Sequence, residues 1–65
     1  MDLKDLVDKY IQVELRNGKK VKGILTAVKD YEDGDFFYTA LQIRVKEDDY
    51  KIIYLIEVDS IGEII

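Results

Sequence analysis

Residues 11–25 read IQVELRNGKKVKGIL, and this stretch predicts a β-hairpin. Polar and apolar side chains alternate over residues 11–16, which is the pattern of a half-buried strand with one apolar face made of Ile11, Val13 and Leu15. Asn17-Gly18 follows, and this dipeptide favours a two-residue type I′ turn, because both central positions of that turn need a positive φ. A second strand is therefore expected over residues 19–29.

A glycine at position 23 interrupts the alternation of this second strand. Before it, the polar side chains of Lys20 and Lys22 flank the apolar Val21. After it, both faces of the strand are apolar. A glycine inside a strand marks a sharp bend or a close backbone approach, and a bent long strand lets a small sheet curl on itself. We therefore expect the strand to bend at Gly23.

Three further strands are expected over residues 36–46, 50–58 and 61–65, with a polar loop over residues 30–35. The third strand places four apolar side chains on one face, which predicts them in the core: Phe37, Leu41, Ile43 and Val45. The fourth strand is apolar on both faces in its middle. One of these faces can fill the core, and the other needs a partner.

Residues 2–10 predict a short α-helix ahead of the strands. Apolar side chains recur at helical spacing, and Asp2 is placed to cap the first turn, with the apolar face made of Leu3, Leu6, Val7 and Tyr10. A helix of this length is not stable alone, so it must dock on the sheet.

The composition limits both the class of protein and its chemistry. The chain has 65 residues and a net charge of −4, and it contains neither cysteine nor histidine. One small domain over residues 1–65 follows, without disulfides, and oligomerisation remains as the means of adding stability. No signal peptide or membrane-length apolar run is present, so a cytoplasmic location is expected. The richness in Ile, Lys and Glu leans toward a thermophile.

Catalysis is not expected from these residues, and neither is a cofactor. Ser60 is the single serine, and there is no histidine to activate it. The segment 30–35 carries four acids, which could form a cation site or a solvated turn. Their spacing does not fit a calcium-binding loop, which favours the turn and no metal.

The segment 13–18, together with Gly23-Ile24-Leu25 and Asp30, resembles the first sequence motif of the Sm, LSm and Hfq proteins. The order of a helix and five strands is similar too, as it is to the C-terminal domain of ribosome maturation factor RimP. The resemblance implies an all-β fold, a strongly bent five-stranded Sm-like or SH3-like barrel with a short N-terminal α-helix. It also implies a homo-oligomeric ring, in which the fourth strand of one subunit pairs with the fifth strand of the next. The interface residues expected here are Ile53, Leu55 and Ile64.

Members of this family often bind uracil-rich single-stranded RNA, with one side chain stacked on the base. The resemblance places candidate RNA-binding residues at Asp30, Tyr31 and Asp33, and Lys20 and Lys22 could contact phosphates or simply protect a solvated strand. The family's Asn is absent from the loop after the second strand, where Asp33 is nearest in register, and residues 58–62 lack the family's Arg. A second hypothesis therefore stays open: an SH3-like protein-interaction or structural module without nucleic-acid binding.

Overall fold

A computed structural model describes residues 2–65 of the chain. Two short 3₁₀ helices and five strands follow each other as η1 (Leu3–Leu6), β1 (Tyr10–Leu15), β2 (Lys20–Asp33), β3 (Phe36–Lys46), β4 (Asp49–Tyr54), η2 (Leu55–Glu57) and β5 (Val58–Glu63). The prediction of an all-β fold with five strands is confirmed.

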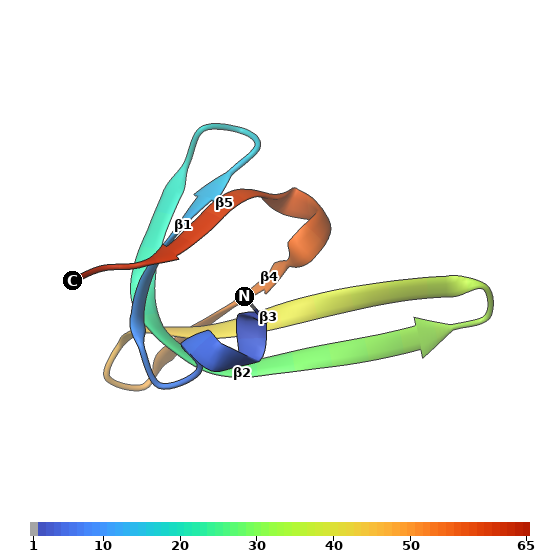
Figure 1. Ribbon diagram of the computed structural model, residues 1–65, viewed down its shortest axis with the longest axis horizontal. Coiled ribbons are helices and arrows are strands. Elements are labelled where there is room, and N and C mark those ends of the chain that lie inside the picture. Colours follow the sequence, from blue (N-terminus) through green and yellow to red (C-terminus); the bar gives the residue numbers. More distant parts are fainter. Residues whose placement is uncertain (1) are drawn as a thin grey trace.

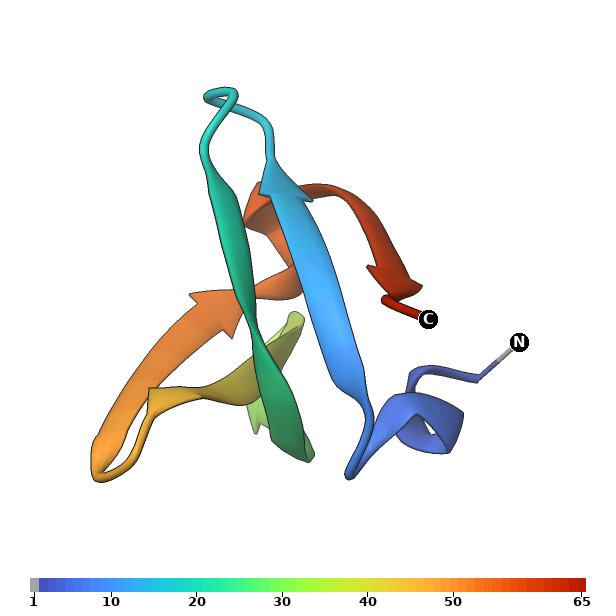
Figure 2. The same ribbon diagram turned by 90° about the vertical axis from the view of Figure 1, so that its left-hand side faces the viewer.

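The five strands form one sheet in the order β4-β3-β2-β1-β5, and every neighbouring pair is antiparallel (Figure 1). β4 and β5 are the two edges, and no pairing joins them within residues 2–65. The sheet is therefore open. Figure 2 shows that it is strongly twisted, with the β3–β4 hairpin turned away from the direction of β1.

The connection between β1 and β2 differs from the predicted two-residue turn. Gly18 N–H donates to the Leu15 carbonyl at 2.9 Å, and Leu15 N–H donates to the Lys19 carbonyl at 2.8 Å. Of the loop residues 16–18, only Gly18 has a positive φ, at 90°. This is the pattern of a three-residue loop whose last residue is left-handed. Asn17 contributes through its side chain, because its Oδ1 accepts a hydrogen bond from Lys19 N–H at 3.0 Å.

β2 changes direction along its length, and two features of the strand account for this (Figure 1). At Gly23 the backbone of β3 approaches so closely that an added Cβ would collide with the Arg44 carbonyl oxygen. The register between β2 and β3 then shifts between Leu25 and Ala27, which is the mark of a β-bulge. Of the two features that a glycine inside a strand can mark, a bend or a close backbone approach, the close approach is present at Gly23.

The core is a small apolar cluster, contributed by η1 and β1 to β4, and consists of Leu6, Ile11, Val13, Leu25, Leu41, Ile43 and Ile53. The alternation predicted for β1 and for the end of β3 is confirmed, since Ile11, Val13, Leu41 and Ile43 are fully buried. Phe37 lies outside this core with 76% of its surface exposed, so its predicted burial is wrong.

The predicted α-helix over residues 2–10 is wrong in both type and length. Only Leu3–Leu6 is helical, as a 3₁₀ turn that Asp2 caps through a hydrogen bond from Lys4 N–H to Asp2 Oδ1. Asp8 then has a φ of 72° and donates its N–H to the Leu25 carbonyl of β2 at 2.7 Å. A longer helix cannot form, because backbone groups from Asp8 onward are hydrogen-bonded to the sheet and β1 already begins at Tyr10.

The boundaries at the C-terminal end also differ from those predicted. β4 ends at Tyr54 instead of residue 58, and β5 covers Val58–Glu63 instead of residues 61–65. The chain must cross from one edge of the sheet to the other here, and η2 makes that crossing. A hydrogen bond from Arg16 N–H to the Glu57 carbonyl at 2.9 Å holds η2 beside the β1–β2 loop.

Candidate functional site

The β2–β3 hairpin extends past the strands on either side of it and forms the most prominent projection of the molecule (Figure 1). β2 and β3 pair as far as Asp33 and Phe36. By contrast, the pairing of β1 with β2 stops at Ile24, and the pairing of β4 with β3 stops at Ala40. Among residues 2–65, the outer part of the hairpin therefore has no neighbouring strand on either side, and its side chains are exposed.

Residues 30–35 belong to this hairpin, so the predicted polar loop is wrong. β2 runs on to Asp33, and only Gly34 and Asp35 separate it from β3. Gly34 has a φ of 60°, and a glycine at the first of two central positions is what a type II′ turn needs. The dipeptide Gly34-Asp35 is itself a hairpin signal, and it could have indicated this turn from the sequence.

Three tyrosines form a cluster on one face of the hairpin and the adjoining edge strand. The rings of Tyr31 and Tyr38 are stacked, with centroids 5.1 Å apart and planes 20° from parallel. The ring of Tyr54 meets Tyr38 edge-on, with centroids 5.8 Å apart. Lys29 and Ile52 line the same shallow depression. We call Tyr31, Tyr38 and Tyr54 the tyrosine cluster.

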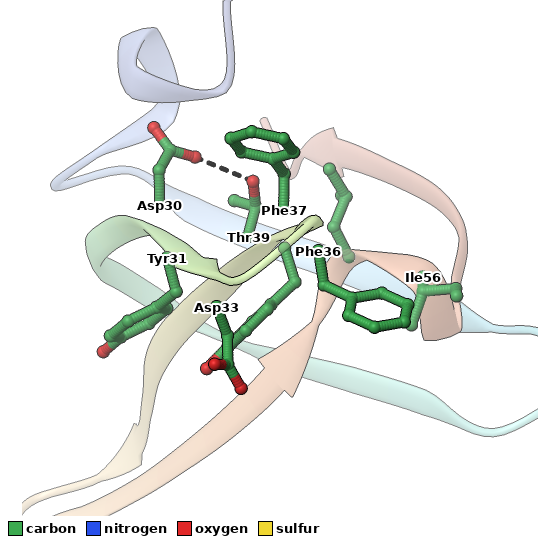
Figure 3. Close-up of a pocket in the computed structure, with 9 residues that line it drawn as sticks. Asp30, Tyr31, Asp33, Phe36, Phe37, Thr39 and Ile56 are labelled. Atoms are coloured by element: carbon green, nitrogen blue, oxygen red, sulfur yellow. Dashed lines mark hydrogen bonds between the residues drawn. The ribbon is translucent and has the colours of Figure 1, made fainter.

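A groove of about 730 Å³ lies along the hairpin beside η2, and its lining is mostly apolar. Leu55 and Ile56 of η2 form one wall, and Phe36 and Phe37 belong to the hairpin wall. Figure 3 shows the Phe36 ring beside Ile56, with Phe37 and Thr39 on the opposite side of the hairpin ribbon. Phe36 and Ile56 are each 77% exposed, so large apolar side chains lie open to water here.

The groove carries negative charge and no positive charge. Asp30 and Asp33 are its only charged lining residues within the described chain. Asp30 Oδ1 accepts a hydrogen bond from Thr39 Oγ1 at 2.7 Å, and this bond crosses from β2 to β3 (Figure 3). Nowhere in residues 2–65 do three acidic side chains come together in a way that could hold a metal ion.

The predicted RNA-binding residues fall into two groups that the structure keeps apart. Asp30, Tyr31 and Asp33 lie in the outer part of the hairpin, whereas Lys20 and Lys22 lie at the opposite end of β2. All five side chains are exposed. A single ligand-binding patch made of both groups is therefore not formed within one copy of the chain.

The predicted interface residues occupy three different environments. Ile53 is only 5% exposed and belongs to the core, so its expected outward orientation is wrong. Leu55 is half-buried in η2 and lines the groove. Ile64 is half-buried just beyond β5, where its N–H donates to the Tyr10 carbonyl at 2.8 Å. The outward-facing residues of β4 are instead Tyr50, Ile52 and Tyr54.

Sequence reasoning missed the exposure of Phe36, Phe37 and Ile56. Two phenylalanines in a strand indicate burial by composition, and nothing local in residues 55–57 marks a 3₁₀ turn. A signal for the outward face of β4 was present in the alternation of Tyr50, Ile52 and Tyr54.

Comparisons of the chain with protein-family models, with curated proteins and with solved structures gave no match. Within residues 2–65, no helix has the length and apolar character needed to cross a membrane. The β2–β3 hairpin, the groove and the outer face of β4 are therefore the features that indicate a function.

Proposed function

We propose that this chain is an Sm-like subunit, a small SH3-like β-barrel that assembles with copies of itself into a ring. The strand order β4-β3-β2-β1-β5 and the strongly bent β2 support the fold assignment. The observation that carries the assembly is the outer face of the edge strand β4, where Ile52 is 56% exposed beside Tyr50 and Tyr54.

An apolar edge strand favours association for two physical reasons. Its outer backbone N–H and carbonyl groups have no partner strand within residues 2–65, and they can pair with a strand of another copy. Its exposed apolar side chains gain about 25 cal/mol for each Å² that association removes from water. β5, the other edge of the same sheet, is available as the complementary strand, so successive copies can join head to tail.

The experiment is a measurement of mass in solution by native mass spectrometry and light scattering. We expect the parent chain to form a closed oligomer, and Ile52→Lys to give a folded monomer. Ile56→Lys is the matched control, because it places the same charge on an exposed isoleucine outside β4 and should leave the oligomer intact. A monomeric parent, or an oligomer that survives Ile52→Lys, would refute assembly through β4.

A second candidate function is the binding of single-stranded RNA, and the tyrosine cluster favours it. The stacked pair Tyr31–Tyr38 presents aromatic faces beside Lys29. Stacking of a base on an aromatic side chain contributes about 1–3 kcal/mol. The acids of the hairpin oppose it, because they repel phosphate.

A titration with a short oligouridine at two salt concentrations tests this second function. RNA binding predicts an affinity that falls with salt, and Tyr31→Ala should weaken it at least about fivefold. Tyr10→Ala removes an exposed tyrosine on β1 and is the control. Binding that is absent, or equal in both variants, excludes RNA recognition by the tyrosine cluster.

A further inference from the structure

The edge of β3 is free along Phe36–Thr39, and the groove lies along this edge. β2 pairs with one side of these residues, but β4 pairs with β3 only from Ala40 onward. β4 ends at Tyr54, where the chain turns into η2. Within the described residues, the β4 side of Phe36–Thr39 therefore has no partner strand, at the place where a longer β4 would have continued.

The lining of the groove shows that it surrounds this edge. Phe37 and Thr39 come from one face of the strand, and Phe36 comes from the other, as Figure 3 shows. Leu55 and Ile56 stand opposite them on η2. Such a site suits an extended chain, because an added strand bonds to the edge through its backbone and directs alternate side chains to the two faces.

The negative charge around the groove favours extended chains that carry cationic side chains. Residues 30–39 contain four acids, Asp30, Glu32, Asp33 and Asp35, and no Lys or Arg. All four are exposed on the hairpin. Long cationic side chains can pair with these carboxylates and can also pack over the faces of Phe36 and Phe37. Acidic segments and phosphate-bearing chains are repelled by the same charges.

We propose that the groove binds an extended segment of another protein, in which apolar side chains alternate with Lys or Arg, as an added strand on the β3 edge. The apolar side chains would pack against Phe36, Leu55 and Ile56, and the cationic ones would meet the hairpin carboxylates. This binding goes beyond the proposed assembly and uses different residues, because assembly relies on the outer face of β4.

The test uses the full chain and two synthetic peptides, one alternating Lys and Leu and one alternating Glu and Leu. We expect the Lys-Leu peptide to bind at least about tenfold more tightly, with an affinity that falls as salt is added. In nuclear magnetic resonance spectra, the shifted backbone amides should be those of residues 36–39 and 55–56. Methylating alternate peptide nitrogens should abolish binding, because strand addition needs them as donors.

Variants separate this proposal from its alternatives. Phe36→Ser and Ile56→Lys should each lower the affinity for the Lys-Leu peptide about tenfold or more. Tyr50→Ser, near the other end of β4, should leave this affinity unchanged. Ile52→Lys should still bind the peptide even where it dissociates the oligomer, so loss of assembly and loss of peptide binding can be told apart. Any of four results would overturn the proposal. These are equal affinity for both peptides, amide shifts confined to the tyrosine cluster, tighter binding of oligouridine than of the peptide, and a groove filled by a second copy of the chain.

Discussion

Gly23 is the position where the fold depends most directly on the absence of a side chain. A Cβ there would collide with the Arg44 carbonyl oxygen and would lie 2.8 Å from Ile43 Cγ2. The first of these neighbours is backbone, which cannot move without breaking the pairing of β2 with β3. Branched side chains make the conflict worse.

We therefore expect Gly23→Ala to lower the free energy of unfolding by about 2–4 kcal/mol and Gly23→Val to lower it further. Urea denaturation followed by circular dichroism measures this change. Gly62→Ala is the control, because an added Cβ at Gly62 meets nothing within 4 Å. If Gly23→Ala were as mild as Gly62→Ala, the close approach of β2 and β3 would be disproved.

Asp48 is held in the left-handed region, with a φ of 64°, in the turn between β3 and β4. Side chains other than glycine pay a steric penalty in this region. Asp48→Gly should therefore raise the free energy of unfolding by about 0.5–1 kcal/mol, as measured by thermal denaturation. Asp35→Gly, at a turn residue without a positive φ, should instead be neutral or destabilising. A loss of stability in Asp48→Gly would contradict this turn geometry.

The outer part of the β2–β3 hairpin shows that a regular strand need not be buried, because its side chains are exposed where the pairing of β1 and β4 has stopped. Phe36 and Phe37 are about three-quarters exposed, whereas Leu41, a few residues further along β3, is fully buried. Apolar surface that stays in water in the folded state contributes nothing to stability by burial.

Phe36→Ser and Phe37→Ser should consequently change the free energy of unfolding of a single subunit by no more than about 0.5 kcal/mol, while Leu41→Ala should lower it by about 2–4 kcal/mol. Urea denaturation of the monomeric Ile52→Lys background gives the comparison without a contribution from assembly. A large loss from either serine substitution would mean that the hairpin folds back onto the core.

The molecule as a whole has a small core for its length, with eight buried hydrophobic residues within residues 2–65. Most of its largest apolar side chains lie instead on the surface, in the tyrosine cluster, the groove and the outer face of β4. A domain of this size is marginally stable alone, so the proposed assembly through the outer face of β4 should add stability by mass action.

The melting temperature of the parent should therefore rise with protein concentration, by roughly 10 °C over about a hundredfold range. Differential scanning calorimetry measures the shift. Ile52→Lys should remove the concentration dependence, whereas Ile53→Lys should unfold the chain at every concentration because it buries a charge. A concentration-independent parent would show that the monomer is stable without a partner.

Sequence patterns were enough to predict that there are five strands, the limits of β3 and much of the core. Ile11 and Val13 on β1, and Leu41 and Ile43 on β3, are buried as their spacing predicts, and the limits of β3 are those expected for residues 36–46. This succeeds because a strand directs successive side chains to opposite faces, which is a local property of the backbone. The glycine at position 23 was informative because the effect of a missing side chain on a strand is also local.

Tertiary structure alone decided which apolar side chains were covered. Phe37 shares its face with Leu41, yet it is exposed because the hairpin continues beyond β1 and β4. Residues 2–10 do not form the α-helix that their spacing predicts, because the N–H of Asp8 donates to the Leu25 carbonyl of β2 instead of to a helical carbonyl. The register of β4 against β3 places Ile53 in the core and Ile52 on the outer face. Spacing assigns a side chain to a face, but the overlap of neighbouring strands determines whether anything packs against that face.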